Sequence, residues 1–271
     1  MARVVMALVL AGRRGPGDPL AAAAGVAHRA LVEVDGTSSL ERVVGTLARS
    51  PWIQRTLISI DQPEILAGQP DLSARISAGE ISLIESASSP SRSVLRVLRE
   101  LPPDETLLVT TADHALLSVP MLDHFLSRAH ASGADLAVGL VTRSALRARF
   151  PESRRTYLPF RGESYSGANL FAFLTPRALR AAEFWTRAER FRKRPWRLIS
   201  AFGPLALLLF LLRRLDLDAA FERASRVIGA RITAVKMPFA EAAVDIDKLS
   251  DLELVNRIVS ERHRESGRKS G

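Results

Sequence analysis

The sequence contains no cysteine among its 271 residues. This absence excludes disulfide scaffolds and any zinc or iron–sulfur site that depends on cysteine ligands. Aromatic residues make up only 6%, and the sequence shows no basic strand interleaved with aromatic residues. Because single-stranded nucleic acids are usually bound by stacking on such residues, we predict no nucleic-acid partner, although the formal net charge is +9.

The sequence also lacks a long hydrophobic run. The fifteen uncharged residues at 198–212 fall short of the roughly 20 apolar residues that span a bilayer. The apolar N-terminal segment is followed by Gly-Arg-Arg-Gly at 12–15 instead of a small-residue cleavage site. We therefore expect neither a membrane span nor a signal peptide, and we predict a cytoplasmic protein.

What the sequence does contain is an alternation of apolar segments with two different periods. Residues 4–10 form a strand-length apolar run that ends in a glycine-rich turn, and Ser39–Ala48 has apolar residues at helical spacing. Further strands are predicted at 55–60, 80–84, 106–110 and 135–140, and further helices at 92–101 and 119–132. This alternation predicts a Rossmann-like α/β fold, a three-layer α/β/α sandwich around a mostly parallel sheet.

The pattern changes after residue 141. We predict a loop at 143–161, strands at 165–174 and 231–238, and helices at 176–190, 218–227 and 250–262. The sequence shows neither an internal repeat nor a flexible linker. It therefore predicts one domain over 1–262, with a helical insertion rich in basic and apolar residues around 177–229 and a polar tail at 263–271.

The first motif with chemical potential follows the first predicted strand. Residues 10–17 combine three glycines with Arg13 and Arg14. Glycine allows successive backbone N–H groups to point at one ligand, and the arginines add positive charge, which together suit a polyphosphate. The segment has the spacing of neither a P-loop nor a dinucleotide-binding turn, so an ordinary flexible turn is an equally good interpretation of the composition alone.

A carboxylate follows the buried strand predicted at 106–110. Asp113 stands where such a strand meets the ligand crevice of a parallel sheet, and a hard oxygen ligand there suits Mg²⁺. The alternative is that Asp113 caps the next helix, although that helix is predicted to begin later, near Ser118 or Pro120. We interpret the adjacent His114 as a local orienting side chain and not as a base.

Two more carboxylates lie close together near the C-terminus. A strand-like alternation over 244–247 places Asp245 and Asp247 on one face, where two negative charges repel unless a cation or solvent compensates them. One interpretation is a second metal ligand. The other is that Ser250 or Asp247 caps the final helix, and the two interpretations are compatible.

Taken in order, these motifs resemble the MobA-like nucleoside-triphosphate transferases of the GT-A superfamily. The segments AGRRGPGDPLA at 11–21 and HRALVEVDG at 28–36 are similar to the opening signature that holds the triphosphate in that family. Residues 111–114 resemble its metal-binding aspartate motif, 166–171 its acceptor-side segment and 245–252 its closing motif. The resemblance implies a GT-A-like nucleotidyltransferase fold with a mixed sheet.

The resemblance also implies catalytic and metal-binding residues. Arg14, Arg29 and Asp113 would be catalytic, with Arg29 in the place of a phosphate-contacting lysine of the family. We expect Arg29 to contact the triphosphate and to contribute little to stability. Asp113 and Asp247 would hold Mg²⁺, and carboxylates that share one hydrated cation should lie within about 8 Å of each other.

The remaining implied contacts are with the two substrates. Gly167 and Asn169 would touch the acceptor. The nucleotide would be bound by residues of two loops, namely Leu10, Ala11, Gly12, Arg13, Gly15, Ser88, Ser91 and Ser93. Arg13 departs from the family pattern, which has glycine at this position.

Such a site would transfer a nucleoside monophosphate from an NTP to a phosphorylated small acceptor, such as a sugar or polyol phosphate, and release pyrophosphate. Both reactants are anionic, so the reaction needs mainly positioning and neutralisation of charge by Mg²⁺, arginine and backbone N–H groups. Two alternatives are a GT-A-type glycosyltransferase, in which an Asp-x-Asp motif is expected, and a non-catalytic nucleotide-binding or membrane-associated protein of the same fold.

The segment 190–214 is unusual because basic residues and a tryptophan flank the apolar stretch at 198–212. Such flanks suit peripheral contact with anionic lipid at the inner face of the membrane. A helix buried in the core, or in the interface of a homodimer, is the other interpretation. The sequence leaves these alternatives open.

Overall fold

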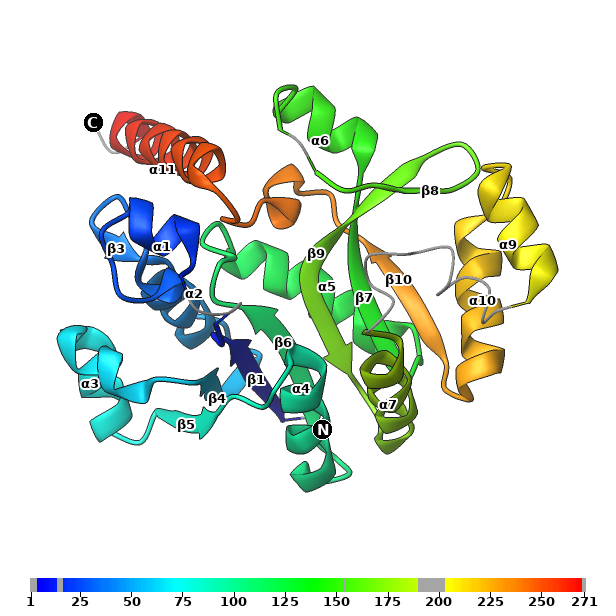
Figure 1. Ribbon diagram of the computed structural model, residues 1–271, viewed down its shortest axis with the longest axis horizontal. Helices are drawn as coiled ribbons and strands as arrows, with labels where there is room; N and C mark the ends of the chain where they lie inside the picture. Colours follow the sequence, from blue (N-terminus) through cyan, green and yellow to red (C-terminus); the bar gives the residue numbers. More distant parts are fainter. Residues whose placement is uncertain (1–3, 14–16, 154, 190–202, 270–271) are drawn as a thin grey trace.

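The computed structural model describes residues 4–13, 17–153, 155–189 and 203–269. Its centre is an eight-stranded sheet with the order β10-β7-β9-β6-β1-β4-β5, and β8 pairs with β9 beside this path (Figure 1). Neighbouring strands are parallel except along β9, which runs antiparallel to β6, β7 and β8. The strands of this sheet are β1 (Val5–Leu10), β4 (Ile53–Ile60), β5 (Ile81–Glu85), β6 (Thr106–Thr111), β7 (Leu136–Thr142), β8 (Leu158–Pro159), β9 (Ser164–Phe173) and β10 (Ile232–Lys236).

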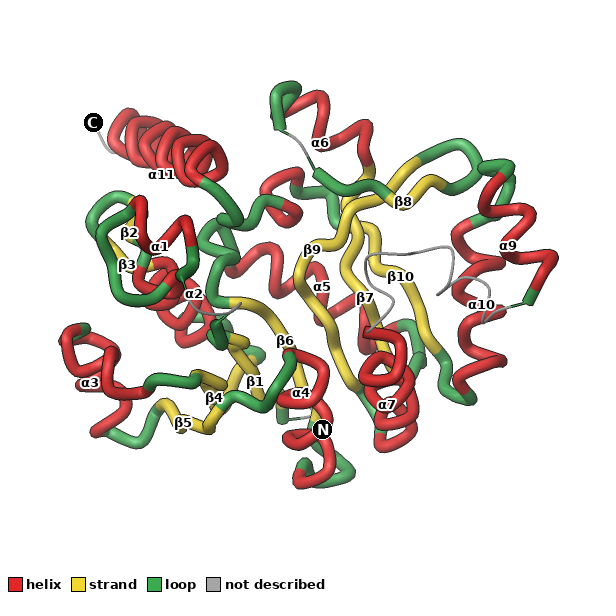
Figure 2. The backbone as a smooth tube through the Cα atoms, viewed as in Figure 1, coloured by secondary structure: helices red, strands yellow, loops and turns green. Residues whose placement is uncertain are grey.

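Both faces of the sheet are covered by helices. Alternate residues of β1 point into two separate hydrophobic clusters, with Ala7 and Val9 in one and Leu8 in the other. Phe125 of α5 belongs to the first cluster and Val94 of α4 to the second. The fold is therefore the predicted α/β sandwich with a mostly parallel mixed sheet, whose helices and strands are distinguished in Figure 2.

The helices and short strands outside the sheet have the following bounds: α1 (Pro19–Ala23), η1 (Arg29–Leu31), β2 (Glu33–Val34), β3 (Thr37–Ser38), α2 (Ser39–Ala48), η2 (Pro63–Gly68), α3 (Pro70–Ser77), α4 (Pro90–Glu100), α5 (Val119–Ala131), α6 (Arg143–Arg149), η3 (Pro176–Ala178), α7 (Leu179–Ala188), α9 (Pro204–Leu211), α10 (Leu217–Ile228), η5 (Ala240–Ala243) and α11 (Leu249–Lys269). The elements predicted before residue 142 are all present, with ends that differ by one or two residues.

Three predictions about the second half were wrong. The predicted loop at 143–161 contains α6 and β8, because Thr142 caps the helix and Leu146 is fully buried within an otherwise arginine-rich segment. Residues 244–247 form no strand, because their alternation reflects burial of Val244 and Ile246 in a loop between η5 and α11. The predicted polar tail is helical as far as Lys269, because glutamate, arginine and lysine are good helix formers.

The insertion after α7 is only partly described. Residues 190–202, and with them most of the predicted basic flank, lie outside the described residues. The apolar stretch contains α9, and the following α10 packs on β10 and near Tyr165, with Leu217 buried. Within the described ranges, no helix combines the length and apolar character required to cross a membrane.

Candidate active site

The predicted carboxylates lie together at the carboxyl edge of the sheet. β1 ends at Leu10 and continues into the glycine-rich loop, and β6 ends just before Asp113. The backbone N–H of Ile246 donates to the carbonyl oxygen of Asp113 (3.1 Å), which draws the loop between η5 and α11 onto the end of β6. The next helix, α5, begins at Val119 with Ser118 at its N-cap, so Asp113 does not cap it.

Three carboxylates form the centre of this edge. Asp113, Asp245 and Asp247 each offer an oxygen, and these oxygens lie within 4.8 Å of one another. This separation meets the limit of about 8 Å that we expect for carboxylates sharing one hydrated cation. Asp113 and Asp245 are half-buried, whereas Asp247 is exposed. Because three negative charges at this distance repel one another, the arrangement requires compensating positive charge.

Arg155 supplies part of that charge. Its guanidinium donates to a carboxylate oxygen and to the backbone carbonyl of Asp245 (2.9 Å for the carbonyl), and it donates to the carboxylate of Asp251 (3.3 Å). The side-chain amide of Asn169 donates to the other carboxylate oxygen of Asp245 (3.1 Å). Both oxygens of Asp245 are therefore engaged within the protein. The sequence analysis missed Arg155, which is one of 38 basic residues and belongs to no motif.

Asn169 is aimed at Asp245 by an irregularity in β9. Its φ of 49° lies in the left-handed region, which asparagine tolerates better than most residues. The pairing of β7 with β9 shifts register between Val138 and Leu140, opposite this residue. Gly167, the other predicted acceptor residue, is exposed on the same strand. Asn169 thus lies beside the carboxylate cluster, and Gly167 precedes it by two residues on β9.

Arg29 reaches the cluster from the opposite side. Its guanidinium donates to the carbonyl oxygen of Ile246 (2.8 Å) and lies 3.4 Å from a carboxylate oxygen of Asp247 and 3.3 Å from one of Asp18. Only 9% of its side chain is exposed. These contacts tie η1 to the N-cap of α1 and to the loop before α11, so Arg29 has partners within the protein besides the triphosphate contact that the sequence predicts.

The glycine-rich loop is held against the ends of the neighbouring strands. The N–H of Ala11 donates to the carbonyl of Ser59 (2.8 Å), while the half-buried Leu10 ends β1. A Cβ atom added to Gly12 would lie 2.9 Å from Oγ of Ser86, so only glycine fits here without a shift. Two further predicted residues of this loop, Arg14 and Gly15, lie outside the described residues.

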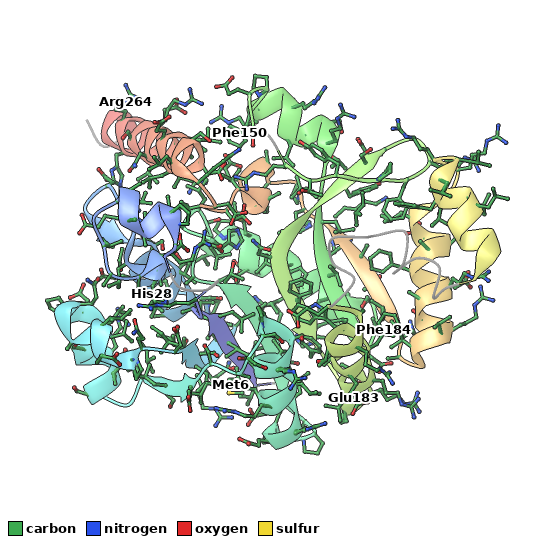
Figure 3. The ribbon with its side chains drawn as sticks, viewed as in Figure 1. Met6, His28, Phe150, Glu183, Phe184 and Arg264 are labelled. Carbon is green, nitrogen blue, oxygen red and sulfur yellow. The ribbon has the colours of Figure 1, made fainter. Side chains whose placement is uncertain are left out.

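Asp61, which the sequence analysis did not predict, joins this loop to η1. It accepts from the backbone N–H of Arg13 (3.1 Å) and lies 3.6 Å from that residue's Nε. Nε2 of His28 lies 3.3 Å from Asp61, and Nδ1 accepts from the N–H of Ala30 (3.1 Å). His28, labelled in Figure 3, is fully buried, and this burial lowers its pKa below the usual value. The neutral ring therefore carries its hydrogen on Nε2.

The serines predicted to contact the nucleotide differ in accessibility. Ser88 is exposed at the loop before α4. Ser91 is buried and donates to the carboxylate of Glu189 (2.6 Å), and the buried Ser93 accepts from Ser59 (3.1 Å) and from the N–H of Ala87 (2.9 Å). A direct contact from Ser91 or Ser93 to a nucleotide requires these internal contacts to open.

His114 lies behind the cluster. It is completely buried, its Nδ1 lies 3.3 Å from the hydroxyl of Thr110, and burial lowers its pKa to about 4. The ring is therefore neutral at pH 7, and it is inaccessible to a substrate in this structure.

Two adjoining cavities, which share Glu152 and Ser153 in their lining, lie on the predicted acceptor side of the site. One has a volume of about 510 Å³, and the other, of about 650 Å³, lies at the start of α11. Arg155 lines the smaller cavity and also bonds to Asp245, so this space adjoins the carboxylate cluster. The smaller cavity is lined by Arg147, Pro151, Glu152, Ser153, Arg155 and Tyr157. This lining combines charged and hydroxyl groups with the apolar surfaces of Pro151 and Tyr157.

Comparison with known proteins assigns this site to a family. The MobA-like NTP transferase domain matches residues 7–183, a range that includes the glycine-rich loop, Asp113 and β9. The chain belongs to this family. It is therefore a nucleotidyltransferase, as the order of the motifs predicted. The matched range ends before Asp245 and Asp247. These two carboxylates therefore belong to a part of the chain that the family match does not cover. No curated protein matches the chain by sequence.

Solved structures are similar in fold over nearly the whole chain. A hypothetical transferase from Thermus thermophilus is 26% identical with a TM-score of 0.75, covering 92% of this chain and 99% of that one. The 4-diphosphocytidyl-2C-methyl-D-erythritol synthase from Anaerococcus prevotii is 14% identical, with a TM-score of 0.53 and coverage of 96% and 97%. A CMP:2-keto-3-deoxy-manno-octonic acid synthetase in complex with CTP is 12% identical, with a TM-score of 0.54 and coverage of 96% and 98%. The last two show the fold alone.

Proposed function

We propose that this MobA-like transferase moves a nucleoside monophosphate from an NTP to a phosphorylated small acceptor, such as a sugar or polyol phosphate, in a Mg²⁺-dependent reaction. The observation that carries the proposal is the group of three carboxylates whose oxygens lie within 4.8 Å of one another, near a cavity that is lined in part by Arg155. The two neighbours that act as synthases, one of them in complex with CTP, support the choice of nucleoside triphosphates as the first substrates to test.

The donor set fits Mg²⁺. Carboxylate oxygens are the hard ligands that Mg²⁺ prefers, and Mg²⁺ sites commonly use one or two carboxylates together with substrate phosphates. Asp113 and Asp247 would hold the ion, because both oxygens of Asp245 already accept from Arg155 and Asn169. When bound, the ion supplies positive charge beside the triphosphate.

The chain's own residues would orient the two anionic substrates. The backbone N–H groups of the glycine-rich loop would bind the triphosphate, and Arg13 and Arg29, which lie beside Asp61 and Asp247, would contribute positive charge. An oxygen of the acceptor phosphate would form a bond to the α-phosphorus. The bond from that phosphorus to the bridging oxygen would break, and pyrophosphate would leave with the electron pair.

The acceptor would approach from the side of β9. Gly167 is exposed on this strand, and the side-chain amide of Asn169 donates to Asp245 of the carboxylate cluster. The body of the acceptor would occupy the cavity of about 510 Å³, where Tyr157 offers an apolar ring and Glu152 and Ser153 offer hydrogen-bonding groups. We place the enzyme in the cytoplasm, where nucleoside triphosphates and sugar phosphates are both available.

The test is a release assay for pyrophosphate. Each of the four NTPs is combined with a pool of sugar and polyol phosphates, with Mg²⁺ and with an excess of chelator. We expect pyrophosphate release that requires one particular NTP, one acceptor and Mg²⁺. Asp113→Asn should reduce this release by about 10²–10³-fold, as is typical when one electrostatic contact in a transition state is lost. Asp104→Asn is the matched control, because Asp104 precedes the other end of β6. Transfer of the sugar from a supplied nucleotide sugar without release of pyrophosphate from any NTP, or no turnover with any pair, would contradict the proposal.

A further inference from the structure

The C-terminal end of α9 exposes three large apolar side chains. Leu208 is 52% exposed, Leu211 62% and Leu212 55%, whereas Phe210 of the same turn is only 9% exposed. The last turn of the helix thus buries Phe210 against the protein and leaves these three leucines open to solvent. A cluster of exposed leucines is unusual on a monomer that is soluble in water, and such patches commonly mark contact with a membrane or another protein.

Two arginines follow these leucines directly. Arg213 has a φ of 55°, a left-handed conformation that is uncommon for a residue other than glycine. Leu209 accepts from the N–H groups of both Arg214 (2.7 Å) and Leu215 (3.0 Å), which closes the turn and leaves both arginines exposed. Positive charge at a helix C-terminus is favourable in itself, but this effect does not explain the leucines beside it. We call Leu208, Leu211, Leu212, Arg213 and Arg214 the α9 tip.

We infer that the α9 tip docks this protein on an anionic phospholipid surface. Leucines buried at the boundary of the acyl chains and arginines at the level of the phosphates are the two contributions that bind amphipathic segments to membranes. α9 is eight residues long and cannot cross the bilayer, so the contact is peripheral.

Charge favours lipid over a second copy of this chain. In a two-fold symmetric dimer the same surface meets itself, so the two arginines of each copy would approach those of the other. The chain also carries a net charge of +9, which opposes self-association and favours an anionic partner. A negatively charged lipid surface compensates this overall charge.

The docking surface is connected to the acceptor side of the active site. The N–H of Arg161, in the turn between β8 and β9, donates to the carbonyl oxygen of Leu215 just after the α9 tip (2.9 Å). β9 continues from this turn to Gly167 and Asn169. A protein held by the α9 tip would therefore present this hairpin beside the membrane. Docking itself does not depend on the proposed reaction and is measured without nucleotide.

Co-sedimentation of the full chain with vesicles tests the inference. One set of vesicles contains phosphatidylcholine with phosphatidylglycerol, and the other contains phosphatidylcholine alone. We expect binding to the anionic vesicles only, and a decrease of at least about fivefold for Arg214→Ala, since each basic residue near the surface contributes about 1 kcal/mol. High salt should also weaken binding, because it screens attraction to the headgroups.

The apolar contribution is tested with Leu211→Glu. We expect this substitution to lower binding to anionic vesicles by at least about tenfold, the equivalent of 1.4 kcal/mol, since burying a leucine contributes about that much or more. Val4→Glu is the matched control, because Val4 is also an exposed aliphatic residue but precedes β1 at the opposite edge of the sheet. Thermal unfolding of each variant confirms that the fold is retained.

The outcomes distinguish docking on lipid from association with a second copy of the chain. Loss of vesicle binding in Leu211→Glu but not in Val4→Glu supports docking on lipid. Equal binding of both variants would overturn the inference. So would sedimentation of the wild-type chain as a dimer that Leu211→Glu converts to a monomer, without affinity of the wild-type chain for anionic vesicles at low salt.

Discussion

The two sides of the active site are built differently. On the nucleotide side, hydrogen bonds link segments that follow or end adjacent parallel strands. For example, Ser59 near the end of β4 donates to Ser93 of α4. On the acceptor side, Arg155 in the loop after α6 binds Asp245, a residue 90 positions further along the chain. The first side combines neutral contacts with separate ion pairs such as Arg13–Asp61, whereas the second is centred on one buried arginine that two carboxylates share. We therefore expect substitutions on the two sides to have different consequences.

The largest effect on stability is expected at Arg155. Arg155→Met would leave Asp245 and Asp251 without their shared cation, and removing one partner from a buried ion pair costs about 3–5 kcal/mol. The free energy of unfolding, measured by denaturant titration at pH 7, should fall by that amount. Arg155 is 7% exposed.

A surface pair provides the control for this substitution. Arg257 is 52% exposed and lies 2.9 Å from Glu152, so Arg257→Met should cost less than about 1 kcal/mol. A loss of similar size in both variants would show that the acceptor side is not held together by its buried charges. Combining Arg155→Met with Asp245→Asn should recover part of the lost stability, because it removes one of the uncompensated carboxylates.

The second comparison lies within the carboxylate cluster. Asp247→Asn should reduce turnover by about 10²–10³-fold and weaken Mg²⁺ activation while leaving the melting temperature nearly unchanged, because Asp247 is exposed. Asp245→Asn should instead lower the melting temperature, because its oxygens accept from Arg155 and Asn169. Activity against Mg²⁺ concentration and thermal unfolding are the two measurements. If both variants change Mg²⁺ activation and melting temperature in the same way, Asp247 is not distinguished as a metal ligand from Asp245 as a positioning residue.

The same difference explains how much could be predicted from the sequence. The glycine-rich loop, Asp113 and the elements before residue 142 were predicted because local periodicity and strand ends specify them. Arg155 could not be found in this way, since its importance comes from a contact between distant segments. Asp61 and His28 were missed for a related reason, because burial gives them their roles and sequence patterns do not show which polar residue is buried. The alternation at 244–247 predicted a strand wrongly, because it comes from the burial of Val244 and Ile246 in a loop.

The nucleotide side should respond to changes in volume. Gly12→Ala would place a Cβ atom 2.9 Å from Oγ of Ser86, and overpacking of this kind typically costs about 1–3 kcal/mol. We expect a lower free energy of unfolding together with a higher KM for the NTP, since the loop is displaced. The double variant Gly12→Ala/Ser86→Ala should recover most of both losses. If the double variant is no better than the single one, the defect of Gly12→Ala lies in the backbone and not in the contact with Ser86.

The smallest effect concerns pH and again distinguishes the two sides. Burial lowers the pKa of His28 from its ordinary value, and the nearby Arg13 lowers it further, whereas Asp61 and Asp18 raise it. The unfolded chain therefore binds a proton at a higher pH than the folded protein does. The resulting stability is fully present above about pH 6.5, the unfolded value, and declines as the pH falls below it.

His28→Asn tests this assignment, because asparagine can still accept from the N–H of Ala30 at the N-cap of η1 but does not titrate. Between pH 7 and pH 5 the free energy of unfolding of the wild-type protein should fall more steeply than that of the variant. His263→Asn, at an exposed position on α11, is the control for the loss of a histidine outside the site. Parallel pH profiles for wild type and His28→Asn would mean that the neutral ring of His28 does not hold the nucleotide side together, and that the pH sensitivity of this enzyme arises from its carboxylates.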